Sequence, residues 1–213
     1  MTAMADNSES TGGARAAATA PGGRRSFIID TAATLFDEHG YHNTSMEDIA
    51  EGVGLAKPTL YHYFRSKDEI LFEIHNAMIE MILASHQERL PGSPGRWGEL
   101  LKEMMGDIIR LMETHPGHLR IFFEHHRELP ESYKTTIRSK RNRYRDHVRD
   151  VIVNGIEAGE FRAVDPDLAT LAVLGVANWT YQWLYPAGEY SAEHVTDAFY
   201  TYLSHGLALQ PDD

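Results

Sequence analysis

One short stretch, residues 44–67, constrains the fold more than any other part of the chain. Ser45 precedes Asp48 by three residues, an acidic form of the capping box, so a first helix is expected to begin there. Gly54 supplies the backbone freedom that a tight turn between two helices requires. Pro58 suits the first turn of a second helix, because the N–H that proline lacks would have no partner there. The stretch therefore predicts a helix-turn-helix.

The second helix of this unit has an inner and an outer side. Leu60 and Phe64 recur at a spacing of four and are expected to face inward. No acidic residue occurs between Gly52 and Lys67, which favours contact with phosphates. In a helix-turn-helix the start of the second helix reaches bases in the major groove. The residues expected at DNA are Thr44, Ser45 and Lys67 at phosphates, Thr59, Tyr61 and His62 at bases, and their neighbours Lys57, Pro58 and Tyr63. An ordinary helical hairpin in another all-α domain is the alternative.

Residues 59–67 also carry a resemblance to a known family. They resemble the DNA-binding signature of the TetR family of one-component repressors, which ends in Thr-Leu-Tyr-x-Tyr/His-Phe-x-Ser-Lys. The similarity covers roughly residues 25–72, about the length of a three-helix DNA-binding unit. It implies an all-α fold with an N-terminal three-helix helix-turn-helix DNA-binding domain and a C-terminal helical ligand-binding and dimerisation domain. The chain is further similar to the actinobacterial repressors of sterol and fatty-acid catabolism, whose effectors are acyl-CoA thioesters.

Composition sets outer bounds on the protein class. With 213 residues, 42% of them hydrophobic, the chain can bury a core in one large or two small domains. The absence of cysteine excludes a disulfide framework and agrees with a cytoplasmic location. A net charge of −11 argues against a generally basic coat but allows a local basic surface for DNA. No apolar run indicates a signal peptide or a membrane span.

Gly, Pro and helix-capping residues predict where the segments of the chain begin and end. Residues 1–23 are rich in Ala, Gly, Ser and Thr and are expected to form a disordered arm, either touching DNA or simply solvated. Residues 24–70 are assigned to the DNA-binding domain and 71–210 to ligand binding and dimerisation. A second capping box, Ser66 to Glu69, opens a long helix that ends near Leu90, before a loop at 91–95. Further helices are expected at 96–114, 117–129, 131–158, 166–185 and 191–208.

Met, aromatic and Arg residues concentrate in the second half and suggest a ligand cavity, although ordinary core packing explains any single one of them. Trp179 and Trp183, four apart, are expected to form one wall. Arg141 falls inside an apolar stripe, so it needs either an acidic partner such as Glu124 or Glu128 or an anionic ligand. The residues expected to bind the ligand are Met104, Met105, Met112, Arg120, Phe123, Arg141, Tyr144, Arg145, Trp179 and Trp183.

The last two helices are expected to form a homodimer as a four-helix bundle with their symmetry mates. Small residues permit close helix approach, and apolar residues supply the surface. The residues expected at the dimer interface are Leu168, Leu171, Ala172, Gly175, Phe199, Tyr202, Leu203 and Gly206.

Enzymatic and metal-binding classes have little support. The histidines at 115, 118, 125 and 126 lack the spacing of metal ligands, and no His-Glu-x-x-His motif or Gly-x-Ser-x-Gly elbow occurs. No metal, cofactor or catalytic residue is therefore expected. The favoured hypothesis is a dimeric repressor released from a palindromic DNA operator by a small apolar effector, which the resemblance suggests is an acyl-CoA thioester. A ligand-independent architectural DNA-binding protein and a helical thioester-handling enzyme remain alternatives.

Overall fold

The structure is a computed structural model that describes residues 23–89 and 95–207. Within these ranges it consists of α-helices and two 3-10 turns, without a β-strand, which confirms the all-α prediction. The helices are α2 (Gly23–His39), α3 (Met46–Gly52), α4 (Lys57–Tyr63), α5 (Lys67–Arg89), α6 (Trp97–Thr114), α7 (Pro116–Glu124), α8 (Glu131–Glu157), α9 (Pro166–Trp179) and α10 (Ala192–Leu207). The 3-10 turns are His126–Glu128 and Thr180–Gln182. The predicted arm at 1–23 lies outside the described residues except for Gly23, and so does most of the predicted loop at 91–95.

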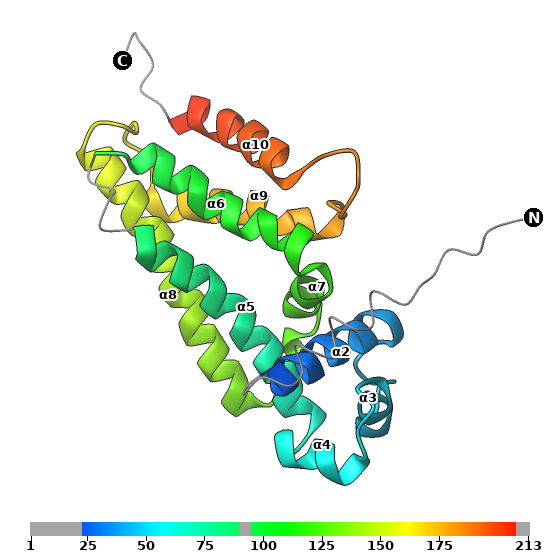
Figure 1. Cartoon of the computed structure of the whole chain (residues 1–213). Helices are drawn as coiled ribbons and strands as arrows, with labels where there is room; N and C mark the ends of the chain where they lie inside the picture. Colours follow the sequence, from blue (N-terminus) through cyan, green and yellow to red (C-terminus); the bar gives the residue numbers. More distant parts are fainter. Residues whose placement is uncertain (1–22, 90–94, 208–213) are drawn as a thin grey trace, which may run out of the picture.

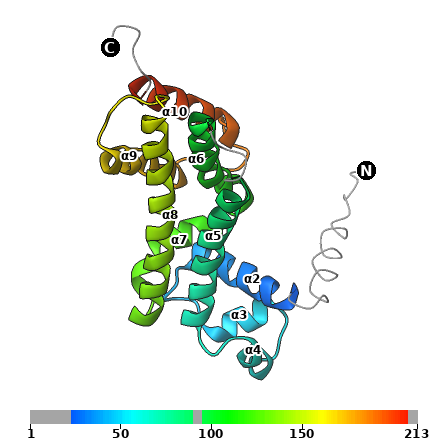
Figure 2. The same ribbon diagram turned by 90° about the vertical axis from the view of Figure 1, so that its left-hand side faces the viewer.

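The helices form a small N-terminal unit and a larger C-terminal unit. Helices α2, α3 and α4 pack together at one end of the molecule, whereas α6, α9 and α10 lie at the other end (Figure 1). Helix α5 runs from the small unit into the large one beside α8, as both ribbon views show (Figure 2). Helix α7 lies between the two units and contacts both α2 and α5. Two helices, α5 and α7, therefore connect the units.

The local signals in residues 44–67 act as the sequence predicts. The Ser45 hydroxyl accepts a hydrogen bond from the Asp48 N–H at 3.2 Å, and the Ser45 N–H donates to the Asp48 carboxylate at 2.7 Å. The Ser45 N–H, and after it the Ser45 side chain, stabilise the Asp48 carboxylate and lower the pKa of that carboxyl. Gly54 adopts a left-handed φ of 65° between α3 and α4, and Pro58 lies in the first turn of α4. The helix-turn-helix is thus built from short-range interactions.

The second capping box likewise forms at the start of α5. The Glu69 N–H donates to the Ser66 hydroxyl at 3.2 Å, and the Arg65 N–H donates to the Glu69 carboxylate at 2.8 Å. Along α5 the predicted apolar stripe is buried, and its members join one hydrophobic cluster that continues through both units. The buried stripe consists of Ile70, Leu71, Ile74, Met78 and Ile82. No helix among the described residues is long and apolar enough to cross a membrane.

Two of the predicted helices are shorter in the structure. The helix predicted at 166–185 ends at Trp179, where the Thr180 hydroxyl donates to the Ala177 carbonyl at 2.7 Å and a 3-10 turn follows. Trp183 therefore lies beyond the helix that carries Trp179. The helix predicted at 117–129 is α7, which ends at Glu124 before another 3-10 turn. Each of these helices ends in a tighter turn that the apolar spacing alone does not reveal.

Candidate functional site

Helix α4 presents polar and aromatic side chains to solvent. Its inner residue Leu60 is fully buried, and so is Phe64 just after the helix. Tyr61 is 42% exposed, His62 is exposed and Thr59 is half-buried. The expected base-contacting residues thus lie together on the outer side of a helix held from beneath by apolar packing. This is the arrangement that a recognition helix needs to enter a groove.

Two of the expected phosphate ligands are used inside the protein instead. The Lys67 ammonium donates to the Tyr41 carbonyl at 2.7 Å and the Thr44 carbonyl at 3.0 Å, and it lies 4.4 Å from the centre of the Tyr41 ring. Thr44 is 1% exposed, and its hydroxyl lies within hydrogen-bond distance of the Leu35 and Gly40 carbonyls. Both residues therefore hold the turn before α3 in place. Ser45 remains half-exposed at the start of α3, where a phosphate can approach its side chain.

Replacing Lys67 by methionine is expected to lower the free energy of unfolding by about 1.5–3 kcal/mol, because carbonyl oxygens lose a charged donor. Urea denaturation measures this loss. The matched control is Lys57→Met, since Lys57 pairs with Glu47 while both side chains are at least half exposed. The Lys57→Met substitution should lower the free energy of unfolding by less than about 1 kcal/mol. Unchanged stability of Lys67→Met, together with a flatter salt dependence of DNA binding, would instead support a phosphate contact.

Arg25 is a further residue that organises the DNA-binding unit. Its guanidinium donates to the Tyr63 carbonyl at 2.8 Å and to the Glu73 carboxylate at 2.7 Å, and it lies 4.1 Å from the centre of the Phe64 ring. These contacts join α2 to the end of α4 and to α5. In the sequence, Arg25 is the second residue after the arm at 1–23, which was expected either to touch DNA or to be solvated. In the structure it stabilises the orientation of the recognition helix.

A small apolar cavity lies inside the larger unit. Its volume is about 110 Å³, and it is bordered by α5, α6, α7, α8 and α9. The lining residues are Ile79, Ile82, Ile108, Leu119, Phe122, Phe123, Arg141, Tyr144, Leu174 and Asn178. Of the residues expected to bind a ligand, Phe123, Arg141 and Tyr144 lie here. Sequence reasoning missed the lining residues on α5, α6 and α9 and the other two on α7, because helical spacing shows that side chains are buried but not that they meet at a cavity.

The other expected ligand-binding residues lie elsewhere. Met104, Met105 and Met112 are at most 1% exposed and fill the core without bordering this cavity. Trp179 is 63% exposed, and Trp183 packs against Phe199 with ring centres 5.9 Å apart, so the two do not form one wall. The predicted wall was wrong because α9 ends before Trp183.

The two other expected arginines are paired with carboxylates. Arg120 donates to both carboxylate oxygens of Asp37, at 2.8 and 2.7 Å. Arg145 is exposed and pairs with its neighbour Asp146 at 2.8 Å. Neither lines the apolar cavity, so the ligand role expected for these two arginines is not supported by their positions.

Arg141 differs from Arg120 and Arg145 in its surroundings. Within the described part of the chain, no carboxylate lies within ion-pair distance of its guanidinium, which sits 4.5 Å from the centre of the Phe122 ring. The predicted pairing with Glu124 or Glu128 does not form, and Glu128 instead meets His42 at 2.9 Å. Burial lowers the pKa of Arg141 below its usual range. A half-buried cation without a counterion favours an anionic ligand.

A second, basic cavity adjoins the apolar one. Its volume is about 410 Å³, and it lies at the start of α8 and the preceding turn. The lining residues are His126, Arg127, Leu129, Glu131, Lys134, Ile137, Arg138 and Arg141. The sequence signal was the spacing of 134, 138 and 141, which places three cations on one face of α8.

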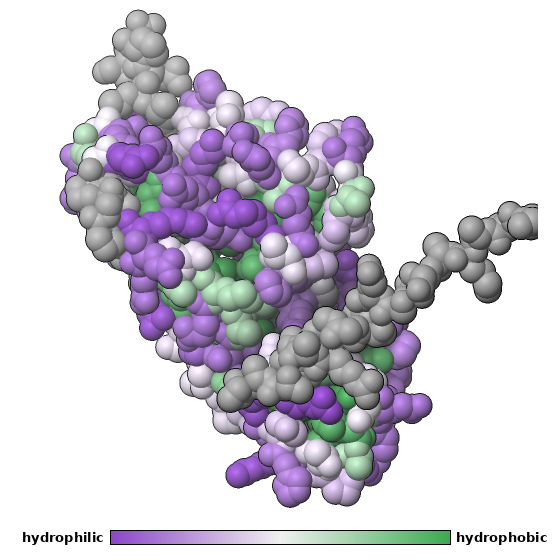
Figure 3. Space-filling view, in the orientation of Figure 1, coloured by the Kyte–Doolittle hydropathy of each residue, from purple (hydrophilic) through white to green (hydrophobic). Residues whose placement is uncertain are grey.

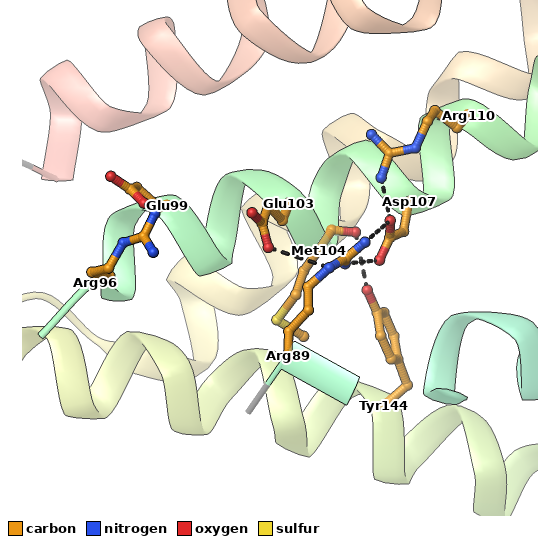
Figure 4. A network of polar contacts seen from close by, with 8 residues as sticks. All are labelled: Arg89, Arg96, Glu99, Glu103, Met104, Asp107, Arg110 and Tyr144. Carbon is orange, nitrogen blue, oxygen red and sulfur yellow. Dashed lines mark hydrogen bonds and ion pairs between the residues drawn. The ribbon is translucent and has the colours of Figure 1, made fainter. Parts of the chain in front are cut away.

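A network of polar contacts lies next to Tyr144, between α5, α6 and α8 (Figure 4). Tyr144 donates a hydrogen bond to the Met104 carbonyl at 3.1 Å, and burial raises the pKa of its hydroxyl. Nearby, Arg89 pairs with Asp107 and, at 3.2 Å, with Glu103, while Arg110 also reaches Asp107 (Figure 4). The network ties the end of α5 to α6. It supports the cavity wall, and Tyr144 offers an aromatic face rather than a free hydroxyl.

The outer face of α9 is apolar and exposed. Leu168 is 65% exposed and Leu171 59%, and Ala172, Gly175 and Trp179 continue the same face. By contrast, the opposite side of the molecule, where α6 and α10 lie in front of α9, is mainly hydrophilic (Figure 3). On α10, the expected interface residues are Tyr202, which is 72% exposed, the half-buried Phe199 and Leu203, and Gly206 in the last turn. An exposed apolar helix face of this kind marks an interaction surface.

A helix-turn-helix unit joined to a helical domain with a ligand-sized cavity defines a one-component DNA-binding regulator. Comparison with family models agrees with this class. Residues 28–74 match the bacterial regulatory proteins of the tetR family, and residues 94–207 match the tetracyclin repressor-like C-terminal domain. The chain belongs to the TetR family of transcriptional regulators.

Individual relatives are similar over most of their length. The HTH-type transcriptional repressor KstR2 of Mycobacterium tuberculosis is 26% identical over 88% of this chain and 94% of its own. The TetR-family regulator PfmR of Thermus thermophilus superposes with a TM-score of 0.79 and is 32% identical, over 86% of this chain and 98% of its own. AibR, solved in complex with isovaleryl coenzyme A and operator DNA, superposes with a TM-score of 0.73 and is 27% identical, over 84% of this chain and 97% of its own.

Proposed function

We propose that the protein is a homodimeric repressor that binds a palindromic operator and is released from it by a short-chain acyl-CoA thioester. The relative KstR2 is a transcriptional repressor, and AibR binds both isovaleryl coenzyme A and operator DNA. In this proposal Ser45 and Lys57 face phosphates, and Thr59, Tyr61 and His62 face bases, with Pro58 and Tyr63 nearby. Residues 24–70 bind DNA, and residues 71–210 bind the effector and form the dimer.

One observation carries the effector assignment: Arg141 borders both cavities. On one side lies an apolar space, and on the other lie Arg127, Lys134 and Arg138. An acyl-CoA has the same division, with an apolar acyl group joined through a thioester to a chain that carries several phosphates. Guanidinium groups pair well with phosphate oxygens, often through two hydrogen bonds. A ligand of this kind would supply the counterion that Arg141 lacks.

The size of the apolar cavity limits the acyl group. Its volume of about 110 Å³ is smaller than the roughly 150 Å³ of a cavity that accepts benzene. An acyl group of about four or five carbons therefore fits, whereas a steroid ring system does not. The sequence alone leaves the size of the acyl group open, and the proposal is narrower because Met104, Met105 and Met112 fill the core instead of lining a larger space.

Release from DNA requires the effector to prefer the state that does not bind the operator. A hundredfold preference corresponds to about 2.7 kcal/mol, which a few charged contacts can provide. Dimerisation through the apolar face of α9 would place two α4 helices on two half-sites, as a palindromic operator demands. The proposal therefore gives a role to three parts of the molecule. Helix α4 binds DNA, the paired cavities bind the effector, and the outer face of α9 forms the dimer.

Replacing Arg141 by methionine is expected to weaken isovaleryl-CoA binding by roughly tenfold or more, because a phosphate or thioester oxygen loses a charged donor. Methionine keeps a long apolar side chain above Phe122. Calorimetry measures the affinity, and gel-shift titration measures operator binding without ligand, which should stay near wild type. Arg145→Met is the matched control on the same helix, since Arg145 is exposed and paired with Asp146.

Free CoA and isovalerate test the two cavities separately. Each should bind more weakly than the thioester, because each fills one cavity only. If isovaleryl-CoA, butyryl-CoA and longer acyl-CoAs neither bind nor reduce operator occupancy, the effector assignment is wrong. If Arg141→Met and Arg145→Met lost the same affinity for isovaleryl-CoA, Arg141 would not be the specific contact for the anionic part of the ligand.

A further inference from the structure

The segment from Pro116 to Glu128, which comprises α7 and the following 3-10 turn, contacts both the cavities and the DNA-binding unit. Leu119, Phe122 and Phe123 border the apolar cavity, and His126 borders the basic one. The spacing of these four residues, at 119, 122, 123 and 126, places them on one face of a helical segment. Any ligand that occupies the proposed effector site therefore touches this segment directly.

The other side of the same segment is held to α2 by polar contacts. Arg120 Nη1 donates to Asp37 Oδ1 at 2.8 Å and to Oδ2 at 2.7 Å. His118 Nε2 lies 3.1 Å from Asp30 Oδ1. Asp30 and Asp37 are seven residues apart on α2, so both carboxylates lie on the helix face that meets α7. A Cβ at Gly117 would lie 3.8 Å from the Asp37 carboxylate, an ordinary van der Waals distance, so the start of α7 lies directly against this part of α2.

A third contact joins the turn after α7 to the loop between α2 and α3. Glu128 Oε2 lies 2.9 Å from His42 Nε2, and the ring of His125 lies 6.3 Å from that of Tyr41. Among these contacts the Arg120–Asp37 pair is the best shielded ion pair, with side chains 31% and 22% exposed. A single arginine nitrogen bonding both carboxylate oxygens depends on distance and direction, so a small shift of α7 weakens it.

We propose that Arg120 and Asp37 are positioning residues that transmit effector binding from α7 to the DNA-binding unit. This inference rests on the proposed effector site, and it assigns the transmission to a specific contact. A ligand that pushes Phe122 or Phe123 displaces α7, and the Arg120–Asp37 pair then moves α2 with it. Because α2 packs against α3 and α5, its displacement changes the spacing of the two recognition helices in a dimer. In this mechanism, movement of helix α5, which follows the recognition helix, does not by itself release the operator completely.

The test compares variants of the full chain by two affinities: isovaleryl-CoA by calorimetry, and operator DNA with and without isovaleryl-CoA by fluorescence anisotropy. Arg120→Gln and Asp37→Asn should bind isovaleryl-CoA within about threefold of wild type. The ratio of operator affinities without and with ligand should fall from roughly 100 in wild type to below about 10 in either variant. The charge-swapped double variant, Arg120→Asp with Asp37→Arg, should recover most of the ratio.

The matched control is Lys102→Gln, which removes an ion pair of 2.9 Å between Lys102 and Asp197 inside the larger unit. It should keep the wild-type ratio. A wild-type ratio in Arg120→Gln, or an equal loss in Lys102→Gln, would overturn the inference.

A ligand-free arm separates this inference from the proposed effector. If no acyl-CoA binds the wild-type protein, the effector proposal fails by itself. The positioning role is then judged by a double-mutant cycle on operator affinity without ligand. Effects of Arg120→Gln and Asp37→Asn that are not additive support the contact as a determinant of DNA binding, and strictly additive effects overturn it.

Discussion

Replacing Gly175 by arginine is expected to convert the protein to monomers and to weaken operator binding by roughly 100-fold or more, because one half-site alone then holds each protomer. Gly175 lies on the exposed apolar face of α9, between Leu171 and Trp179. A charge placed in the middle of an apolar interface is buried without a partner, which strongly disfavours association.

The structure makes Gly175 a better test position than Leu203. A Cβ at residue 175 would meet no atom within 4 Å, so the folded monomer accommodates a side chain there. Arginine also has a higher helix propensity than glycine, although by less than the ~0.8–1 kcal/mol that separates glycine from alanine. Leu203 is half-buried against the core, so a charge there would disturb folding as well as association.

Sedimentation equilibrium measures the monomer fraction, and anisotropy titration measures operator affinity. Asn142→Arg, at an exposed position on α8, is the matched control and should leave both quantities unchanged. A dimer that persists in Gly175→Arg at wild-type strength would place the interface on another surface.

The helix-turn-helix could be predicted residue by residue because its signals are local. The Ser45 cap, the left-handed Gly54 and the early Pro58 each act within a few residues of themselves. Even so, Lys67 was assigned to phosphate, whereas it binds carbonyls more than twenty residues earlier in the chain. Which partner a flexible cation selects depends on packing that the sequence pattern does not encode.

The cavity could not be predicted to the same degree, because its walls come from five helices. Helical spacing identified Arg141 as a cation inside an apolar stripe, and the structure places it at the junction of two cavities. The same reasoning misplaced Arg120, whose partner Asp37 lies 83 residues earlier. A pattern shows that a side chain points inward, but only the tertiary arrangement shows whether it meets a cavity, a carboxylate or the core.

Helix α9 is apolar around most of its circumference, so its apolar side chains can face either the core or a partner subunit. In the structure Val173 and Ala177 face the core, while Leu168 and Leu171 face solvent. The exposed side carries residues expected from the sequence at the dimer interface, while α6 and α8 pack against the helix from the other side.

Lowering the pH from 7 to 5 is expected to reduce the free energy of unfolding by about 2 kcal/mol through His75 alone. His75 is 0% exposed on α5, where its Nδ1 donates to the Leu71 carbonyl at 2.9 Å. Its Nε2 has no hydrogen-bond partner among the described residues. Burial is the largest cause that lowers its pKa to about 4, and the nearby Arg141, His126 and His125 lower it further.

The sign follows from the two pKa values of this imidazole. In the unfolded chain its pKa is about 6.5, so below that pH the unfolded state binds a proton that the folded state does not. Stability is therefore lost as the pH falls from about 6.5 towards 4, and the loss levels off below the folded pKa. His86, with its pKa also lowered to about 4 mainly by burial, acts in the same direction.

His75→Gln isolates this contribution, because glutamine can still donate to the Leu71 carbonyl but does not titrate. Urea denaturation of both proteins at pH 7 and pH 5 should show that the variant loses about 2 kcal/mol less than wild type between the two values. Carboxylates that titrate in this range affect both proteins alike and cancel in the difference. If His75→Gln keeps the wild-type pH dependence, the folded protein accepts a proton at His75, and the lowered pKa is wrong.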